Sequence, residues 1–473
     1  MARRGETDGH GVGGRWTLTG AMLLAVLEFA FASYPDQQYI LEGADSLLAE
    51  ATSVINVVSS ADGGALQLVD GALTGSLVLR VQSAVYPFDV GLPSWNGSAP
   101  GDSGAFRVFI RVPYGTGWSP WLEVGYWKAN LWPGTKSTTF AGGRIDIDTM
   151  ELSSYVSAWQ FKVEFKRLAP GVRSPTLRLL SFFASDSRRT AEFNLSEALA
   201  DRPPAIFVPT RFIAQYKVSQ EFGGRICSPT TVAMILASYG INVDPLAFAL
   251  DTYDPYWQIF GVWPRVVQNA AEHGLRGTVA RVRSWSQAYQ ILASGGRIGM
   301  SVGPPLYQGH LMMLAGFTAA GDPIVHDPAR STDGYAHVFN KADLSRSWFE
   351  KGGVAYVFTG VCTPTAVAQT GEGQRTGGPP STLGLLPVYP NPFSLSGEQA
   401  GLTIAFSLPR PEVVAVSIYN AVGQIVAEWS SQEFTAGRHA VQWQPEARVA
   451  PGVYFYRVVA GRQIACGRFV ITK

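Results

Sequence analysis

Alternating apolar and polar residues dominate the first part of the chain, from about residue 34 to residue 191. The clearest stretch is Trp159–Lys166, in which large apolar residues occupy every second position. Such alternation is typical of a β-strand with one buried face. Turn sequences such as Tyr114–Gly117 separate the alternating stretches at short intervals. Residues 34–191 are therefore predicted to form an antiparallel β-sandwich.

The middle of the chain follows a helical period instead. Apolar side chains recur three and four residues apart at Val232, Ile235, Leu236 and Tyr239. This spacing places them on one face of an amphipathic helix. Pro229 suits the start of that helix and Gly240 suits the left-handed position after its end. With the strand patterns that follow, residues 203–362 are predicted to form an α+β domain.

A third pattern begins after a stretch without hydrophobic periodicity. Residues 363–384 are rich in Thr, Gly, Gln, Ser and Pro, which is typical of a flexible linker. Strand patterns then return, for example at Leu402–Leu408 and Val413–Tyr419. We expect residues 385–473 to form a small immunoglobulin-like β-sandwich.

The N-terminus has the features of a secretory signal peptide over residues 1–32. Basic residues come first, the apolar stretch Gly20–Leu27 follows, and Ala30-Phe31-Ala32 offers a cleavage site. Glu28 interrupts the apolar part, so an apolar first helix of the fold is the alternative. The chain contains no run of 18 uncharged apolar residues, and no membrane span is predicted for the mature protein.

Composition narrows the possible functions. The 473 residues carry a formal net charge of +1, which argues against non-specific binding of nucleic acid. Aromatic residues make up 12% of the chain, enough apolar surface to argue against disorder. Three cysteines are too few for a disulfide framework, so a cysteine in an informative context is expected to have a chemical role before a structural one.

Two features of the first domain suggest ligands without establishing them. The segment Trp118–Trp127 holds four aromatic residues that could stack on sugars, although aromatic residues in strands are more often part of the core. Asp146 and Asp148, placed on one face of a predicted strand, could bind calcium. Two carboxylates without an adjacent ligand-rich loop are weak support for such a site.

Cys227 is the most informative residue of the chain. It directly precedes the predicted helix and follows a glycine-rich approach. Unpaired N–H groups at a helix N-terminus favour an anion, and such a position can lower the pKa of a thiol from about 8.5 to between roughly 3.5 and 7.5. Cys227 is therefore a candidate nucleophile; the alternative is a small buried apolar residue.

A base and its partner follow downstream. His310 opens an apolar strand, and a short turn leads to a second strand that ends in Asp327. Strands joined by so short a turn pair antiparallel, which predicts that His310 and Asp327 lie close together. His326 is the competing histidine, but its side chain is expected on the opposite face of the strand. Cys227, His310 and Asp327 thus predict a catalytic triad.

Residues 205–360 resemble the papain-like cysteine peptidases related to the bacteriocin-processing, double-glycine-leader peptidases. The matching motifs are Val208-Pro209, Cys227-Ser-Pro-Thr, Gly309-His310 and Asp327-Pro328. The resemblance implies that the cysteine is the nucleophile, the histidine the base and the aspartate its orienting partner. It also implies an oxyanion-hole glutamine upstream of the cysteine, for which Gln220 is preferred and Gln215 is the alternative. The transporter fused to the bacteriocin-processing members has no counterpart here, so their leader-peptide substrate does not carry over.

The last 90 or so residues resemble the C-terminal sorting domain of type IX secretion substrates. The matching motifs occur in the family's order: Val388–Phe393, Leu408–Pro411, Val416–Gln424, Gly437–Trp443 and Ala450–Arg457. The resemblance implies recognition by the type IX machinery and delivery through the periplasm to the cell surface or the medium. A generic immunoglobulin-like spacer is the alternative.

Together these predictions describe an exported, monomeric cysteine peptidase that acts on a peptide or protein through a thioester acyl-enzyme. No cofactor or metal is expected, and nucleic acid is not an expected partner. Two rival interpretations are a cysteine-dependent acyltransferase and a catalytically inactive surface-binding protein. In the second, the aromatic N-terminal sandwich would make the contacts.

Overall fold

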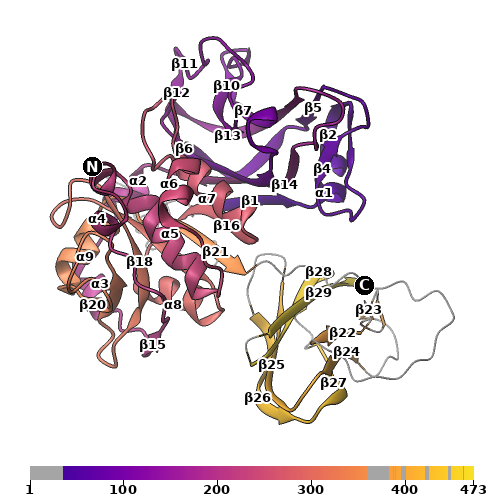
Figure 1. Cartoon of the computed structure of the whole chain (residues 1–473), viewed down its shortest axis with the longest axis vertical. Helices are drawn as coiled ribbons and strands as arrows, with labels where there is room; N and C mark the ends of the chain where they lie inside the picture. The colour runs from indigo at the N-terminus through magenta and orange to yellow at the C-terminus, as the bar shows by residue number, and fades with distance from the viewer. Residues whose placement is uncertain are drawn as a thin grey trace, which may run out of the picture.

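The structure is a computed structural model in which the chain forms several β-sheets and a few helices (Figure 1). It describes residues 36–360, 383–386, 388, 390–391, 393–395, 401–420, 425–445, 449–461 and 463–472. The predicted signal peptide, residues 1–32, and most of the predicted linker, residues 363–384, lie outside the described residues. The prediction of a β-rich, multidomain chain is confirmed.

The N-terminal domain consists of antiparallel strands, drawn in indigo and purple in Figure 1. Its longer elements are β1 (Gln37–Glu42), α1 (Ala44–Ala49), β2 (Ala51–Ile55), β5 (Thr74–Leu79), β6 (Gln82–Ser98), β7 (Gly104–Arg111), β10 (Leu122–Lys128), β13 (Thr149–Arg167) and β14 (Thr176–Ser185). The shorter strands are β3 (Val57–Ser59), β4 (Leu66–Leu68), β8 (Pro113–Tyr114), β9 (Gly117–Trp118), β11 (Thr139–Phe140) and β12 (Gly143–Asp146).

The long strand β13 joins two sheets. Its first part pairs with β12 and β6, and its second part pairs with β7 and β5. The second part contains the alternating stretch predicted from the sequence, and Trp159, Phe161, Val163 and Phe165 are all buried in the core of this domain. Burial of one face along the whole stretch explains its strict alternation.

One prediction for this domain is wrong. Asp146 ends β12, and Ile147 has a φ of 59°, so Asp146 and Asp148 lie at a tight turn between β12 and β13 and not on one face of a strand. Asp148 turns inward and is 6% exposed. No group of three or more His, Cys, Asp or Glu side chains placed to hold a metal ion occurs among the described residues.

The central domain is built on an antiparallel sheet in the order β16-β21-β17-β18-β19-β20, with β15 added beside β18. Its strands are β15 (Ile206–Phe207), β16 (Leu275–Arg281), β17 (Arg297–Val302), β18 (His310–Phe317), β19 (Pro323–His326), β20 (His337–Val338) and β21 (Val354–Gly360). Its helices are α4 (Gln215–Val218), α5 (Cys227–Ser238), α6 (Pro245–Thr252), α7 (Trp263–Glu272), α8 (Trp285–Ala293) and α9 (Lys341–Trp348). The short helices α2 (Arg188–Ala191) and α3 (Leu195–Ala200) precede them.

The predicted helix is present as α5, which packs against β17 and β18. Its residues Val232, Ile235 and Leu236 are fully buried, and Gly240 has the expected positive φ of 81°. The helix begins at Cys227, so Pro229 is its third residue and not its first. A proline is tolerated there because the N–H groups of the first turn have no partner within the helix.

Buried hydrogen bonds join the N-terminal domain to α7 and β16. The Asn96 side chain, which is fully buried, donates to the Gly277 carbonyl at 2.9 Å and accepts from the Gly277 N–H at 3.0 Å. Glu272 accepts from the indole N–H of Trp127 at 2.7 Å. Leu92 and Phe183 of the N-terminal domain belong to the same hydrophobic core as the central sheet. The two domains therefore share one interior.

The C-terminal domain, drawn in yellow in Figure 1, has a core of its own. A three-stranded sheet contains β22 (Gly384–Leu385), β24 (Leu402–Leu408) and β27 (Gly437–Trp443). A five-stranded sheet contains β23 (Phe393–Ser394), β25 (Glu412–Tyr419), β26 (Ile425–Phe434), β28 (Gly452–Ala460) and β29 (Gln463–Thr472). The predicted strands 402–408 and 413–419 match β24 and most of β25.

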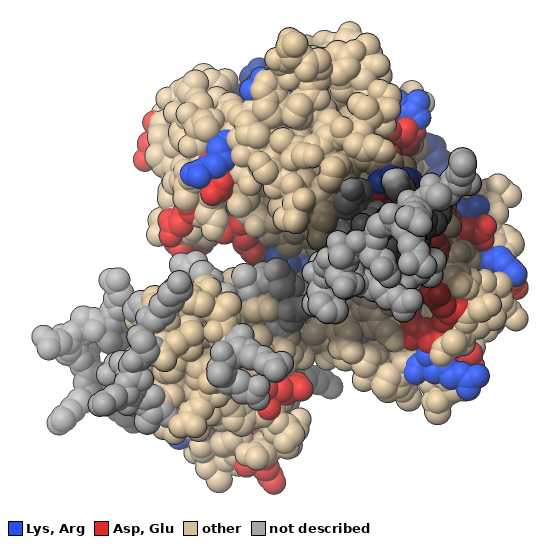
Figure 2. Space-filling view, turned by 180° about the vertical axis from the view of Figure 1, so that it is seen from behind, with Lys and Arg blue, Asp and Glu red and all other residues tan. Residues whose placement is uncertain are grey.

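Charged side chains are sparse on the surface. Figure 2 shows a rear face that is mostly uncharged, with Lys and Arg close to Asp and Glu in small groups. This agrees with a chain in which only 15% of residues are charged. Among the described residues, none of the helices combines the length and apolar character needed to cross a membrane.

Candidate active site

Cys227 is the first residue of α5. The short 3-10 turn Gly223–Arg225 leads into it, and the neighbouring Ile226 is fully buried and anchors the turn. Cys227 itself is partly exposed and forms no disulfide. The thiol therefore lies at the positive end of a helix, where a negative charge is favoured.

His310 and Asp327 meet across the hairpin formed by β18 and β19. Pairing of Met313 with His326 sets the register, which brings the residue after β19 next to the start of β18. The Nε2 atom of His310 lies 2.7 Å from Oδ1 of Asp327. His310 is 5% exposed and Asp327 is fully buried. The carboxylate thus fixes which imidazole nitrogen carries a proton, as the sequence predicts for these two residues.

The imidazole of His310 also acts on the Cys227 thiol, whose pKa it lowers through hydrogen bonding and charge. Because Nε2 faces Asp327, the other ring nitrogen, Nδ1, is the one left for sulfur. The structure therefore brings the three predicted triad residues into one row, from thiol to imidazole to carboxylate. The thiol comes from a helix N-terminus and the other two groups come from the adjoining sheet.

The electrostatics of this row favour a thiolate beside an imidazolium. Burial raises the pKa of Cys227, but the hydrogen bond and charge of His310 outweigh it and hold the pKa below the ordinary thiol value. Burial lowers the pKa of His310, whereas Asp327 and Cys227 raise it, so that it rises to about 9. For Asp327, burial raises the pKa and His310 lowers it, with a net lowering. Both shifts favour a proton on the imidazole over a proton on the thiol.

Tyr307 completes the surroundings of the carboxylate. Its hydroxyl donates to Oδ2 of Asp327 at 2.5 Å, and its ring lies 4.3 Å from the His310 ring, centroid to centroid. The backbone N–H of Ala329 donates to Oδ1 of Asp327 at 3.0 Å. The carboxylate is therefore held on both oxygens. Sequence reasoning missed Tyr307, because a tyrosine three residues before a histidine has no distinguishing pattern.

His326 is separated from this row, as predicted. Its Nδ1 accepts from the Ala336 N–H at 3.0 Å, so its Nε2 carries the proton and donates to the Val208 carbonyl at 3.1 Å. Burial lowers the pKa of His326, which favours the neutral ring. Both ring nitrogens are hydrogen-bonded to backbone groups, and the residue is fully buried.

The structure places the two candidate glutamines in different surroundings. Gln220 lies in an exposed turn, whereas Gln215 is 3% exposed. The Nε2 of Gln215 donates to the Gly223 carbonyl at 2.7 Å, and its backbone N–H donates to the Pro328 carbonyl at 2.8 Å. Gln215 thus links the turn before Cys227 to the loop after Asp327. Spacing favoured Gln220 because distance along the chain does not show how the intervening α4 turn folds back.

A loop of the central domain, residues 254–262, supports the segment around Cys227 from the other side. Arg225 donates to the Gln258 carbonyl. Gly261 lies against the Ser228 side chain, because a Cβ atom added to Gly261 would be 3.5 Å from the Cβ atom of Ser228. The N-terminal domain reaches the end of this loop, because Oδ2 of Asp148 accepts from the Trp263 N–H at 2.9 Å. Asp148 therefore caps α7 from a different domain.

Each of the three domains contains a segment that matches a known protein family. Residues 209–356 match the Peptidase_C39 like family. Residues 70–185 match the Peptidase C39 N-terminal domain, and residues 387–472 match the secretion system C-terminal sorting domain. Both resemblances drawn from the sequence are thereby confirmed. The match of the N-terminal domain was not anticipated, because its strands carry no catalytic motif. Residues 203–360 are called the peptidase domain below.

These matches indicate an exported cysteine peptidase-like protein. The sorting domain indicates export by the type IX secretion machinery to the cell surface or outside. No curated protein matches the chain.

Solved structures add little. An alkylpurine DNA glycosylase of Pseudomonas fluorescens is 16% identical with a TM-score of 0.15, and the match covers 20% of this chain and 30% of that one. A β-glucuronidase of Faecalibacterium prausnitzii is 9% identical with a TM-score of 0.13, covering 93% and 48%. A β-D-glucuronidase of Dictyoglomus thermophilum is 6% identical with a TM-score of 0.12, covering 93% and 44%. The chain thus spans less than half of each, and likenesses this weak carry no argument.

Proposed function

We propose that this protein is an exported papain-like cysteine peptidase that hydrolyses peptide bonds through Cys227, His310 and Asp327. The observation that carries the proposal is the grouping of these three side chains at the N-terminus of α5, where His310 is hydrogen-bonded to Asp327 and lowers the pKa of Cys227. A lowered thiol pKa beside a raised imidazole pKa is the ion pair that such a nucleophile requires.

In the proposed reaction, the Cys227 thiolate attacks the carbonyl carbon of a peptide bond. His310 gives its proton to the leaving amine as the C–N bond breaks, which leaves a thioester on Cys227. His310 then takes a proton from water, the hydroxide attacks the thioester, and the C–S bond breaks to release the carboxylic acid. Asp327 keeps the imidazole oriented throughout, and Tyr307 acts as a positioning residue for Asp327.

Gln215 is the proposed side-chain donor to the oxyanion. Its Nε2 carries two N–H groups, and the Gly223 carbonyl occupies one of them. Burial and the link to Pro328 hold the amide in place without substrate. A donor fixed before the reaction stabilises the developing negative charge without further reorganisation. Gln220, exposed in its turn, serves as a matched control.

The deciding experiment follows cleavage of a peptide library by the full chain and four variants. Cys227→Ala and His310→Ala should each abolish turnover, because the two groups act as one unit. Gln215→Ala should lower kcat by roughly 100-fold, and Gln220→Ala should leave it unchanged. Full activity of the Cys227→Ala variant would overturn the proposal. A chain that binds peptides without cleaving them would support the surface-binding alternative.

Two further measurements refine the assignment. A product formed with an added amine, and absent without it, would indicate the acyltransferase alternative. Alkylation of the intact protein by iodoacetamide at mildly acidic pH should label Cys227 at least roughly tenfold faster than Cys362 and Cys466. Cys362 lies outside the described residues, as does the side chain of Cys466.

The pH profile provides a test of the ion pair. The imidazolium of His310 loses its proton as the pH rises through about 9. The leaving amine then lacks its proton donor, so kcat/KM should fall with a midpoint near pH 9. Asp327→Asn removes a group that raises this pKa, and the alkaline limb should move to lower pH. An unchanged limb in the variant would contradict the role of Asp327.

A further inference from the structure

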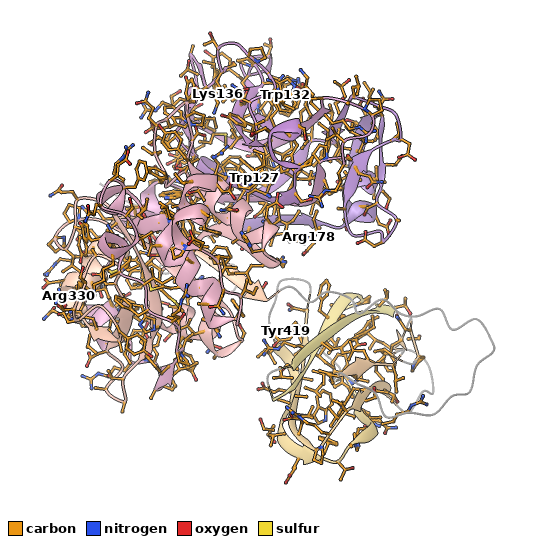
Figure 3. All side chains as sticks on the ribbon, viewed as in Figure 1. Trp127, Trp132, Lys136, Arg178, Arg330 and Tyr419 are labelled. Carbon is orange, nitrogen blue, oxygen red and sulfur yellow. The ribbon has the colours of Figure 1, made fainter. Side chains whose placement is uncertain are left out.

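A cavity of about 220 Å³ lies where the N-terminal domain meets the 254–262 loop of the peptidase domain. The N-terminal domain contributes Arg107, Glu123, Tyr126, Trp132 and Lys136 to its walls, and the loop contributes Tyr256. Figure 3 shows Lys136 and Trp132 near each other in the upper part of that domain. None of these residues belongs to the proposed catalytic row.

Lys136 is the feature of this cavity that calls for an explanation. Its side chain is 7% exposed, and its Nζ has no hydrogen-bond acceptor among the described residues. The rings of Tyr126 and Tyr256 lie 5.1 and 4.7 Å from Nζ, centroid to atom. The Asp254 carboxylate is 4.0 Å away, too far for a hydrogen bond. A buried ammonium with three unused N–H groups is costly unless an acceptor fills the adjoining space.

The acceptor is not expected to be an anion, because Glu123 lines the cavity and Asp254 also acts on Lys136. Arg107 is paired with Glu164 at 2.6 Å and with Glu123 at 3.4 Å. Burial lowers the pKa of Lys136, and the Asp254 and Glu123 carboxylates oppose this by favouring its charged form. A carboxylate or phosphate bound here would face the Glu123 carboxylate, and like charges in a buried site repel strongly.

A hydroxyl group fits these surroundings better. It can accept from the Lys136 ammonium and donate to the Glu123 carboxylate, whereas a carboxylate ligand can only accept. The cavity also offers aromatic rings to an apolar C–H face: Tyr256 is 46% exposed, and Trp132 is partly exposed with Arg107 4.7 Å from its ring centroid. The volume is below the roughly 300–1,000 Å³ of pockets for drug-sized molecules, which suits a single ring.

We propose that this cavity binds one ring of a neutral saccharide, with Lys136 as its central hydrogen-bond donor and Trp132 and Tyr256 as its stacking surfaces. The aromatic segment Trp118–Trp127 contributes only in part. Trp127 is fully buried and belongs to the domain core, whereas Tyr126, which is 2% exposed, lies beneath Lys136 in the cavity wall. Because Tyr256 comes from the peptidase domain, the saccharide would contact both domains.

The test titrates the full chain with maltose, cellobiose and N,N′-diacetylchitobiose, with glucuronic acid as the anionic comparison. Binding is followed by calorimetry and by saturation-transfer NMR. The variants are Trp132→Ala and Lys136→Met, and Trp118→Ala is the matched control on the same domain outside the cavity. Circular dichroism checks each fold, and the partly exposed Trp132 keeps the test decisive if the buried Lys136→Met variant does not fold.

We expect at least one neutral disaccharide to bind with a millimolar or tighter Kd, and each cavity variant to weaken binding at least roughly tenfold. Trp118→Ala should bind as the wild type does. Cys227→Ala should also bind normally, so a failed peptidase assay would leave this result intact. The proposal is overturned if no neutral sugar binds, if glucuronic acid binds more tightly, or if Trp132→Ala binds unchanged.

Discussion

The two β-rich domains that flank the peptidase domain are attached to it in opposite ways. The N-terminal domain contributes Leu92 and Phe183 to the central core and joins β16 through buried hydrogen bonds such as those of Asn96. The core of the C-terminal domain consists, among the described residues, of its own side chains. It meets the peptidase domain where Arg457 donates to the Ser294 carbonyl at 2.6 Å.

The difference separates a domain that shares its interior with the peptidase domain from a domain that is appended to it. Some buried polar groups are hydrogen-bonded only across the interface between two domains. Removing one domain leaves such donors and acceptors without partners. A domain with a hydrophobic core of its own can fold independently and can occur in unrelated proteins. The family matches agree with this division, since one domain is associated with C39 peptidases and the other with secretion.

The largest expected effect comes from removing each domain in turn. Deletion of residues 36–185 exposes β16 and α7, and the remaining peptidase domain should be insoluble or lack a cooperative thermal transition. Deletion of residues 363–473 should leave the transition and the peptidase activity of the purified protein unchanged. Differential scanning calorimetry checks both. A stable, active protein without its N-terminal domain would contradict the shared interior.

The second prediction concerns the sorting domain, residues 385–473. Without residues 385–473, the protein expressed in a host with type IX machinery should remain in the periplasm. A signal peptide and a reporter fused before residues 385–473 should reach the outside. Cell fractionation with an assay of the reporter measures both. A truncated protein that is still exported would support the interpretation of this domain as a generic spacer.

The sequence predicted what depends on local order. Alternation located the buried face of β13, and helical spacing located α5 with Cys227 at its start. The short turn between β18 and β19 was enough to place His310 beside Asp327, because a hairpin sets its own register.

Contacts between distant segments could not be predicted in this way. Asn96 and Gly277 are 181 residues apart, and neither lies in a pattern that marks the other. Asp148 was placed in a strand because the positive φ of Ile147 leaves no trace in the sequence. Gln215 was ranked below Gln220 because only the folded turn shows which amide is buried. Loops have no hydrophobic periodicity, so the sequence did not predict their contacts.

A matched pair of point variants compares the two joints directly, that is, the interfaces of the peptidase domain with the N-terminal domain and with the C-terminal domain. Asn96→Ala leaves the buried N–H and carbonyl of Gly277 without partners, at a cost of about 1–3 kcal/mol each in the free energy of unfolding. The main thermal transition should drop by several degrees. Arg457→Ala, which removes the bond to Ser294, should leave that transition in place. Equal shifts in both variants would mean that the joints are alike.

The smallest effect is a pH dependence at the N-terminal joint. Burial raises the pKa of Asp148 to about 7, above its ordinary value of 3.8, although the N–H of Trp263 opposes this. A carboxyl with a raised pKa holds its proton longer in the folded state than in the unfolded state, so its contribution to stability is complete below pH 3.8 and is lost as the pH rises through about 7. The thermal midpoint of the wild type should therefore fall between pH 6 and pH 8.

Asp148→Asn keeps an oxygen for the Trp263 N–H but cannot ionise, so its midpoint should fall less over the same range. Arg457→Ala, at the other joint, should retain the full wild-type slope, and a slope unchanged by Asp148→Asn would show that this carboxyl does not titrate at the joint.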